Sequence, residues 1–483
     1  MLFNSLDFFI FLPIVFVLYW FVFNKHYKLQ NYLLLVASYF FYACWDYRFL
    51  FLLIFSTVLD YYTGLKIHDS PGRKGKRFWL WLSIGINLGF LGFFKYYNFF
   101  VTSFADLLGS MGLHTNVWTL NIILPVGISF YTFHGLSYVI DIYYDRIKPE
   151  RNFASYSLFV SFFPLLVAGP IERATHLLPQ IIKERLFNFQ QATAGIRLVV
   201  WGLFKKVVVA DNCGIIVDSV FNDPTAGPFH KIIGMIFFSF QIYGDFSGYT
   251  DIARGVAKFF GFELMLNFNL PYFSRSIAEF WRRWHISLSS WFRDYVYIPL
   301  GGSKKGKPKA IRNVFVIFLI SGFWHGANWT FIVWGGIHAL LFLPSFIVRT
   351  SKDTFHQPIV LPGRWFPSFK TVLQILVTFI LVTIAWVFFR AETLTQAIDY
   401  LSFVKELDSP KLSAFEGELN TTAIISMFAI AFMVIFEYIN ICRPKGNFLD
   451  ESSGRLFLLI VFILLQFAYF LKGDSASFIY FQF

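Results

Sequence analysis

The stretch NVFVIFLISGFWHGANWTFIVWGGIHALLFLPSFIV, from Asn313 to Val348, contains no Asp, Glu, Lys or Arg. About 20 consecutive apolar residues are enough for a helix to cross the hydrocarbon core of a bilayer. This stretch is longer than that, so it predicts a helix, a break and a further helix. A segment this long and this apolar places the chain among membrane proteins.

The rest of the chain has the same character. Of its 483 residues, 56% are hydrophobic, 22% are aromatic and only 14% are charged, against about 25% charged residues in an ordinary soluble domain. A soluble core of this length has no room for so much apolar side chain. The composition therefore excludes a soluble globular protein and a disordered chain. The three cysteines are far apart and in no metal or redox spacing, so a disulfide scaffold is excluded too.

Apolar segments recur along the chain and indicate an all-α polytopic membrane protein. Stretches without Asp, Glu, Lys or Arg lie at 8–24, 29–45, 78–94, 107–140, 152–171, 371–389, 419–436 and 456–471. Less pure apolar segments lie near 49–65, 190–220 and 231–262. Together they predict about ten to thirteen membrane elements.

The net charge of +12 comes from 41 Lys and Arg against 29 Asp and Glu. Many of these basic residues gather in short loops, such as 73–77 and 304–312. Cytoplasmic loops of membrane proteins accumulate Lys and Arg, which by itself produces a basic chain. We therefore expect membrane lipid around the protein and no nucleic acid among its partners.

Residues 264–312 are too polar to span a membrane and too aromatic for a free loop. They mix Trp, Phe and Tyr with Arg, Asp, Glu and Ser at high density. Short amphipathic helices at the membrane interface, or entering it, fit this pattern best.

The first candidate for chemistry is His325, in the motif Ser321-Gly-Phe-Trp-His-Gly-Ala-Asn-Trp-Thr. An ionisable residue at membrane depth is costly and is a functional candidate by default. A neutral imidazole can take a proton from a hydroxyl group, as general-base catalysis requires. His325 and Asn328 are three residues apart, so we expect one helix to present both on one side. The alternative is a buried histidine satisfied by a neighbouring carbonyl, and for His338 we expect a structural role.

The glycines of the same motif, Gly322 and Gly326, have no side chain. They are expected to let another backbone, or a substrate, approach closely.

A second group lies within Glu279-Phe-Trp-Arg-Arg-Trp-His-Ile-Ser-Leu-Ser, followed by Trp291-Phe-Arg-Asp-Tyr. Arginine pairs with carboxylates and stacks on aromatic rings. Arg282, Arg283, His285 and Ser287 therefore form a candidate site for an anionic or carbonyl-bearing donor. The alternative is an interfacial element whose arginines form salt bridges and reach toward the lipid headgroups.

A third group contains Asp245, Tyr249 and Asp251 in Gln241-Ile-Tyr-Gly-Asp-Phe-Ser-Gly-Tyr-Thr-Asp. Acids in a lipid environment need partners, and Arg254 or Arg282 and Arg283 are possible ones. Acid-rich sites also bind cations, so a transporter remains an alternative, although the spacing matches no metal-binding loop.

A fourth place is Phe163-Pro-Leu-Leu-Val-Ala-Gly-Pro-Ile-Glu-Arg, which ends at Arg173. There we expect a helix terminus with an ion pair. A phosphate-binding loop, a zinc set and a Gly-x-Ser-x-Gly elbow are all missing from the sequence.

These motifs resemble those of the membrane-bound O-acyltransferase family, in its alginate O-acetyltransferase branch. The resemblance covers nearly the whole chain, and the Arg-Trp-His and Trp-His-Gly motifs make it specific. The matching segments lie at 1–5, 125–133, 163–172, 243–253, 280–289, 322–329, 387–392 and 478–483.

The resemblance implies a fold and a set of site residues. It implies one domain over residues 1–483, with a core at about 120–345 and C-terminal helices at about 370–472. The fold would be a ring of about ten to thirteen transmembrane helices with interfacial or re-entrant helices around a central tunnel. His325 would be the catalytic histidine and His285 the second active-site histidine. The candidate substrate-binding residues are Asn328, Trp324, Arg282, Arg283, Ser287, Asp245 and Tyr249.

The resemblance also implies an activity. The enzyme would move an acetyl group from a cytoplasmic acyl thioester, such as acetyl-CoA, to an exported or cell-envelope polysaccharide. Neither a tightly bound cofactor nor a metal is expected. The implied partner is a periplasmic or secreted acetyltransferase of the SGNH type, or another acyl-relay protein, and the implied location is the bacterial inner membrane. His325 would act as the base, and Asn328 or His285 would stabilise the oxyanion.

Three alternatives remain at this stage. One is the D-alanyl transfer protein of teichoic acid modification, which belongs to the same superfamily. Another is a proton-coupled transporter, in which Asp245, Asp251 and the histidines would relay protons. The absence of an internal repeat in the sequence counts against a transporter. The third is a structural membrane scaffold, for which such concentrated polar motifs would be needlessly costly.

Overall fold

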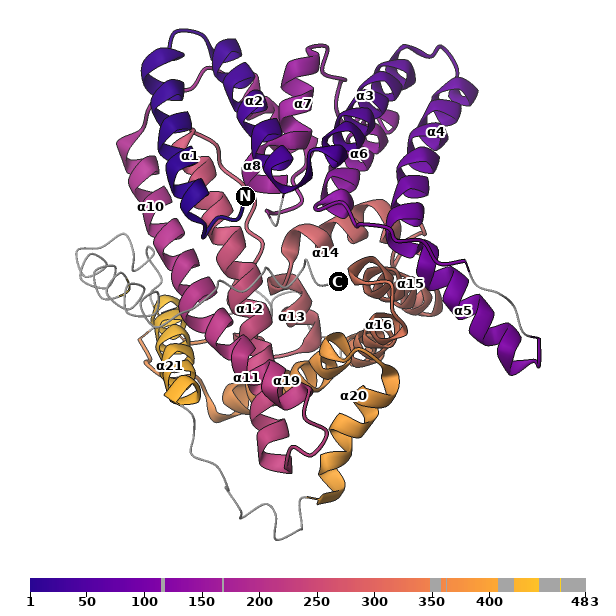
Figure 1. Cartoon of the computed structure of the whole chain (residues 1–483), viewed down its shortest axis with the longest axis vertical. Coiled ribbons are helices and arrows are strands. Elements are labelled where there is room, and N and C mark those ends of the chain that lie inside the picture. The colour runs from indigo at the N-terminus through magenta and orange to yellow at the C-terminus, as the bar shows by residue number, and fades with distance from the viewer. Residues whose placement is uncertain are drawn as a thin grey trace. The chain divides into compact units, whose positions relative to one another are not determined.

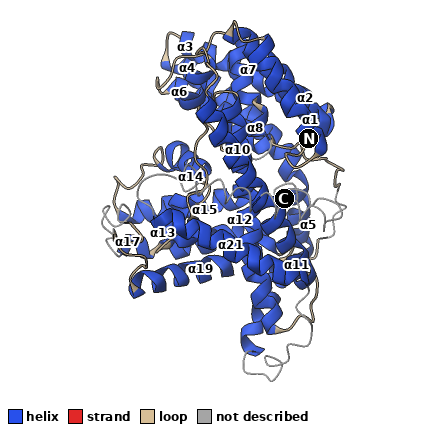
Figure 2. Cartoon of the chain, turned by 90° about the vertical axis from the view of Figure 1, so that its left-hand side faces the viewer, coloured by secondary structure: helices blue, strands red, loops and turns tan. Residues whose placement is uncertain are grey.

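The computed structural model describes residues 1–113, 118–166, 169–347, 358–361, 363–406, 421–442 and 461. These residues form helices joined by turns and loops, and none of them forms a strand (Figure 2). The prediction of an all-α protein is thereby confirmed. The chain divides into two compact units, one formed by residues 1–195 and 253–265, the other by residues 196–252 and 266–483.

The first unit is built from the N-terminal helices. They are α1 (Leu6–Val17), η1 (Leu18–Val22), α2 (Tyr27–Asp46), α3 (Arg48–Asp69), α4 (Arg73–Leu91), η2 (Gly92–Tyr96), α5 (Tyr97–Ser110), α6 (Ile128–Tyr143), α7 (Phe153–Ser161), α8 (Phe163–Leu166) and α9 (Ala174–Ile181). Helices α3, α4 and α6 pack against one another (Figure 1).

The contact between α3 and α4 contains a buried polar network. Asp60 Oδ1 accepts hydrogen bonds from Ser83 Oγ at 2.6 Å and Asn87 Nδ2 at 2.8 Å. A side chain at Gly135 on α6 would collide with the Asp60 carboxyl group, so a glycine is needed there. Because a buried polar group is stable only when it is hydrogen-bonded, this network fixes how the three helices meet.

The second unit carries the remaining helices. They include η3 (Phe204–Ala210), α11 (Asp211–Phe221), η4 (Pro271–Phe273), α13 (Ile277–Arg283), α14 (Ile286–Phe292), η5 (Arg293–Tyr297), α15 (Lys307–His325), α16 (Trp329–Phe342), α17 (Pro344–Ile347), α19 (Phe369–Arg390), α20 (Leu394–Leu401), η6 (Ser402–Glu406) and α21 (Thr421–Cys442). Helices α10 (Phe189–Leu203) and α12 (Pro228–Phe259) each contain residues of both units.

Helices α15 and α16 form a tight antiparallel pair, and α19 packs on α16. Glycines set the spacing of the pair. A Cβ at Gly322 would lie 2.2 Å from the Phe331 carbonyl oxygen, and a Cβ at Gly335 would lie 2.3 Å from that of Phe318. The close approach predicted for Gly322 is therefore an approach of this chain's own backbone.

Five helices in the described part of the chain are long and apolar enough to cross a membrane: Arg48–Asp69, Arg73–Ser110, Trp329–Phe346, Phe369–Arg390 and Thr421–Cys442. A shorter apolar helix covers Leu6–Val22. The protein is therefore a multi-pass membrane protein. The count of ten to thirteen membrane elements stays a prediction, as do the single domain over 1–483 and its division near 120–345 and 370–472. The apolar stretch 456–471 and the motif 478–483 lie, except for residue 461, outside the described residues.

Two local predictions are confirmed. The stretch 313–348 contains the end of α15, a break at residues 326–328, and α16. Residues 264–312 form short helical segments, none of which exceeds seven residues before α15 begins. Their position relative to a membrane stays a prediction.

Candidate active site

Helix α15 ends at His325, and the chain then turns sharply. Gly326 is in an extended conformation, with φ −159° and ψ 152°. A Cβ at this glycine would lie 2.0 Å from the Phe331 ring, so only a glycine leaves the helix along this path. The turn fixes His325 in the interior, where only 3% of its surface is exposed.

The second candidate histidine, His285, lies between the short helices α13 and α14. Its backbone is left-handed, with φ 44° and ψ 54°, at the N-cap of α14. A residue other than glycine in this region carries roughly 1–3 kcal/mol of strain, which is retained where the surrounding structure enforces it. The residue is 1% exposed. Burial lowers the pKa of the His285 imidazole, to about 3, so the ring is neutral at pH 7.

The two histidines meet in an aromatic chamber of the second unit. Their ring centroids are 6.4 Å apart. The indole of Trp324 is centred 4.9 Å from the His325 ring and 6.0 Å from the His285 ring. Three further rings enclose the pair, those of Trp334 and Phe389 against His325 and of Phe246 against His285. The structure thus brings together His325, His285 and Trp324, three of the residues that the sequence singled out.

Asn267 is a residue of this site that the sequence did not single out. It is buried, and its Oδ1 lies 3.1 Å from His285 Nδ1. The same oxygen accepts hydrogen bonds from Ser287 Oγ at 2.9 Å and from Ser287 N at 3.2 Å. Ser287 therefore lies next to the candidate histidine, where its hydroxyl group binds Asn267, and its role in substrate binding stays a prediction.

Two cavities reach residues next to the histidine pair. The first, about 520 Å³, is lined mainly by apolar side chains and includes Ile286, which follows His285, and Ser321, one turn before His325. The second, about 600 Å³, is lined by Gly326, Asn328, Phe389 and Arg390, among others. Gly326 follows His325, and the Phe389 ring is centred 5.3 Å from that of His325.

The prediction that one helix presents His325 and Asn328 together is wrong. The break after His325 makes Asn328 the N-cap of the next helix, where its Oδ1 accepts a hydrogen bond from Thr330 N at 3.0 Å. Its Nδ2 donates to the Glu392 carbonyl at 2.8 Å. Both ends of the amide thus have structural partners, although Asn328 also lines the second cavity. The sequence Asn-Trp-Thr is a capping signal as well as a polar motif.

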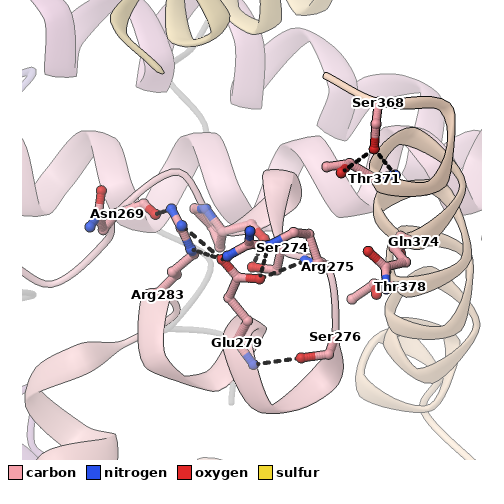
Figure 3. Close-up of polar contacts among 11 residues, drawn as sticks. Asn269, Ser274, Arg275, Ser276, Glu279, Arg283, Ser368, Thr371, Gln374 and Thr378 are labelled. Atoms are coloured by element: carbon pink, nitrogen blue, oxygen red, sulfur yellow. Dashed lines mark hydrogen bonds and ion pairs between the residues drawn. The ribbon is translucent and has the colours of Figure 1, made fainter. Parts of the chain in front are cut away.

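Arg282 and Arg283 have different surroundings. Arg282 is exposed and lines the first cavity. Arg283 donates from Nη2 to Glu279 Oε1 at 2.8 Å, and Arg275 donates from Nε to Glu279 Oε2 at 2.9 Å (Figure 3). For Arg283 the structure therefore supports the salt-bridge alternative, whereas the position of Arg282 suits the binding of an anionic group.

Asp245 and Tyr249 are buried on α12 beside a lysine that the sequence analysis overlooked. Lys206 Nζ lies 2.7 Å from Asp245 Oδ1 and 2.9 Å from Asp211 Oδ1, and it faces the Tyr249 ring at 5.9 Å. Lys205 pairs with Asp251 at 2.6 Å. Two lysines that were not among the expected partners thus form ion pairs with these acids. The occurrence of Lys205 and Lys206 within the apolar segment 190–220 was the signal that could have predicted these buried ion pairs.

The fourth candidate segment, residues 163–173, lies in the first unit. It contains a buried carboxylate, that of Glu172, which has several hydrogen-bond partners. Glu172 accepts hydrogen bonds from His176 Nδ1 at 2.8 Å and from the backbone N–H of Met265. Its own N–H donates to His134 Nε2 at 3.0 Å. The expected ion pair near a helix terminus is present, with His176 as the partner.

His338 has the structural role that was expected of it. It is buried on α16 and accepts a hydrogen bond from Trp281 Nε1 at 3.2 Å. Among the residues that the structure describes, no group of three or more His, Cys, Asp or Glu side chains is arranged to hold a metal ion.

Comparison with known proteins points to one family. The model of the membrane-bound O-acyltransferase family matches residues 143–386, which include both candidate histidines. The chain is 38% identical to "Probable alginate O-acetylase AlgI" of Pseudomonas putida, over 98% of each chain. It is 35% identical to a peptidoglycan O-acetyltransferase of Helicobacter pylori, over all of this chain and 98% of that one. It is 30% identical to a teichoic acid D-alanyltransferase of Bacillus subtilis, over 56% of this chain and 70% of that one.

Proposed function

Because the chain belongs to the membrane-bound O-acyltransferase family and is an O-acyltransferase, we propose that it acetylates an exported or cell-envelope polysaccharide. The two O-acetyl-transferring relatives, whose names refer to alginate and peptidoglycan, match over 98% or more of this chain. The D-alanyl-transferring relative matches over only 56%. The extent of similarity therefore favours an acetyl group and a polysaccharide acceptor over D-alanyl transfer.

The observation that carries the proposal is the buried pair of His285 and His325. One cavity reaches Ile286, which follows His285, and another reaches Gly326, which follows His325. Acyl transfer needs a base, a site for the donor and a site for the acceptor, with water excluded between them. The aromatic rings around His285 and His325 keep bulk water away from the pair. The cavities of about 520 and 600 Å³ provide space for two substrates.

In the proposed reaction, His325 takes the proton of the attacking hydroxyl group. The hydroxyl oxygen forms a bond to the carbonyl carbon of an acyl thioester, and the carbon–sulfur bond then breaks. The proton on His325 passes to the departing thiolate, so that the histidine is regenerated. General-base catalysis contributes about 10²–10⁴ in rate, and the fixed positions of the two substrates supply most of the remainder.

We assign the donor to the first cavity. Its apolar lining suits an acyl chain and its thioester, and Arg282 and Arg293 suit the phosphate groups of a donor such as acetyl-CoA. The second cavity, with Asn328, Arg390 and Glu392, suits a hydroxyl-bearing acceptor or a relay protein of the SGNH type. We propose a bacterial inner membrane as the location, with a cytoplasmic donor and an acceptor on the other side.

The test is substitution of His325 by Ala in the host strain, followed by measurement of acetyl groups on the envelope polysaccharide. We expect acetylation to fall by at least about 10²-fold, because the base is lost. The matched control is His68→Ala, which replaces an exposed histidine at the end of α3 and should leave acetylation unchanged. Protein levels in the membrane are measured for both variants.

Normal acetylation in a His325→Ala strain with normal protein levels would refute the proposal. If the polymer carried D-alanine esters in place of acetyl esters, the teichoic acid branch would be the correct one. A loss of polymer export with unchanged acetyl content per sugar would indicate a transporter.

A further inference from the structure

Asn267 controls the conformation of the chain at His285. Its backbone oxygen accepts a hydrogen bond from Ile286 N at 2.9 Å, and its side-chain Oδ1 accepts one from Ser287 N at 3.2 Å. These two N–H groups belong to the first two residues of helix α14, directly after the left-handed His285. One buried asparagine therefore satisfies the first donors of α14 and holds the strained residue in place.

The same contacts fix which end of the Asn267 amide faces His285. A backbone N–H can only donate, so the atom that faces Ser287 N must be the amide oxygen. That oxygen also lies 3.1 Å from His285 Nδ1. An amide oxygen can only accept a hydrogen bond, so Nδ1 must carry the hydrogen. In a neutral imidazole the other nitrogen, Nε2, then has the free lone pair.

His285 Nε2 belongs to a ring that is surrounded by the aromatic side chains of the chamber. It is buried, and the described residues offer it no hydrogen-bond partner. Leaving a buried acceptor unsatisfied costs roughly 1–3 kcal/mol, so such an atom in a site is commonly one whose partner arrives with a ligand or water. Two rings that carry polar nitrogens lie close to His285, those of Trp324 and His325, with centroids 6.0 and 6.4 Å away.

We propose that Asn267 is a positioning residue that fixes His285 as the Nδ1–H tautomer, so that the Nε2 lone pair is presented toward His325. A centroid distance of 6.4 Å is too long for a direct bond between the rings. It leaves room for one water that accepts from a His325 N–H and donates to His285 Nε2, at about 2.8 Å each. The other nitrogen of His325 takes the hydroxyl proton in the proposed reaction.

This inference deepens the proposed function, on which its catalytic part rests, and it changes one expectation. One role expected of His285 was that of a hydrogen-bond donor to the oxyanion. A neutral His285 with its hydrogen on Nδ1 has no hydrogen to donate from Nε2. His285 instead orients His325, and Asn267 orients His285.

The experiment compares Asn267→Leu and Asn267→Asp in the full-length protein in detergent micelles. Asn267→Leu removes the acceptor at similar volume, whereas Asn267→Asp keeps an oxygen facing Nδ1. The matched control is Asn269→Leu, two residues away and exposed. The tautomer of His285 is read from long-range ¹H–¹⁵N NMR of protein labelled in histidine, and its signals are identified by their loss in His285→Gln.

We expect the Nδ1–H pattern in the unaltered protein, in Asn267→Asp and in Asn269→Leu. We expect the Nε2–H form to appear in Asn267→Leu. The maximal rate of thiol release from acetyl-CoA should fall by about 10–100-fold in Asn267→Leu, the range seen when a residue that orients a histidine is removed. The KM for acetyl-CoA should change little, because Asn267 lines neither cavity. Asn267→Asp should recover most of the rate.

An Nε2–H pattern in the unaltered protein would overturn the proposal, whether or not any variant folds. An unchanged tautomer in Asn267→Leu would also overturn it. The spectra are recorded without any reaction, so they remain decisive if the acetyltransferase activity is absent. Conversely, loss of acetylation in His325→Ala together with an Nε2–H His285 would leave the proposed function standing and refute only the role of Asn267.

Discussion

The imidazole rings of His285 and His325 lie with their centroids 6.4 Å apart and their planes tilted by 58°, although the two residues belong to different elements. His285 precedes the short helix α14, and His325 is the last residue of α15. Their separation therefore depends on packing that lies outside the two motifs.

The spacing of α15 and α16 should be sensitive to single methyl groups. Gly322→Ala and Gly335→Ala each place a Cβ within 2.3 Å of a carbonyl oxygen of the opposing helix. We expect each to destabilise the protein by roughly 1–3 kcal/mol and to reduce acetylation, because the helices must move apart. The melting temperature in detergent and the acetyl content of the polymer measure the two effects.

Gly336→Ala is the matched control for these two variants. It lies next to Gly335 on α16, but its Cβ would meet only Leu319 Cδ2, at 3.9 Å. An alanine is preferred over glycine within a helix by about 1 kcal/mol, so this variant should be as stable as the parent or more so. Equal behaviour of all three variants would contradict the assigned packing.

Substitution of Arg283 should lower the stability of the protein, whereas substitution of its neighbour Arg282 should weaken binding of the donor. Arg283→Met removes a partner of the buried Glu279, so it should lower the melting temperature. Arg282→Met removes an exposed side chain at the rim of the first cavity, so it should leave the melting temperature unchanged and raise the KM for acetyl-CoA. Kinetics and thermal unfolding of both variants separate the effects, and a reversed pattern would refute the assignment of the donor cavity.

Removal of the lysine between Asp211 and Asp245 should be severe. Lys206→Met leaves two buried carboxylates without their shared cation. Breaking a buried ion pair in this way costs roughly 3–5 kcal/mol. We expect little folded protein in the membrane, as measured by size-exclusion chromatography and thermal unfolding.

A second substitution checks the cause of that loss. Lys206→Met combined with Asp245→Asn removes one of the two carboxylate charges and should recover part of the stability. The exposed Lys405→Met should have no effect. A double variant no better than Lys206→Met alone would speak against charge as the cause.

The contact between His176 and Glu172 should make stability depend on pH. A hydrogen bond from His176 to the Glu172 carboxylate raises the pKa of the histidine above its ordinary value of 6.5. The protonated histidine therefore stabilises the fold fully below pH 6.5. That stabilisation is lost as the pH rises through the higher pKa of the folded state. His176 is partly exposed, so the change in melting temperature should be small.

His176→Gln is the test of this pH dependence. The glutamine keeps a hydrogen-bond donor but has no charge to lose. The melting temperature of the parent should fall more than that of the variant between pH 6 and a pH above the folded-state value. Parallel curves for the two proteins would exclude this pair as the source of the effect.

The sequence predicted those features that depend on local pattern. The uncharged stretch around His325 predicted a helix, a break and a further helix, and the dense mixture of aromatic and charged residues near His285 predicted short helices. Both predictions are confirmed. The closeness of His285 and His325 followed from the family resemblance, because no periodicity relates residues on separate elements.

Features that depend on distant contacts were missed. Asn328 was taken for a partner of His325 because the spacing was measured as though the helix continued, whereas Gly326 ends it. Asn267 lies in an irregular segment, where a side-chain contact with His285 leaves no pattern in the sequence. Lys206 was overlooked because an apolar segment was expected to contain no buried ion pair.

The end of α15 at His325 has an electrostatic consequence for the proposed reaction. The aligned peptide groups of a helix place the equivalent of about half a negative charge at its C-terminus. His325 is the last residue of this 19-residue helix, so its imidazole lies in that field. When the ring takes a proton, the resulting cation is stabilised by typically 0.3–1 kcal/mol, and up to about 2 kcal/mol when partly buried. Gly326, which ends the helix after His325, thus also helps to stabilise the positive charge that the imidazole acquires during the reaction.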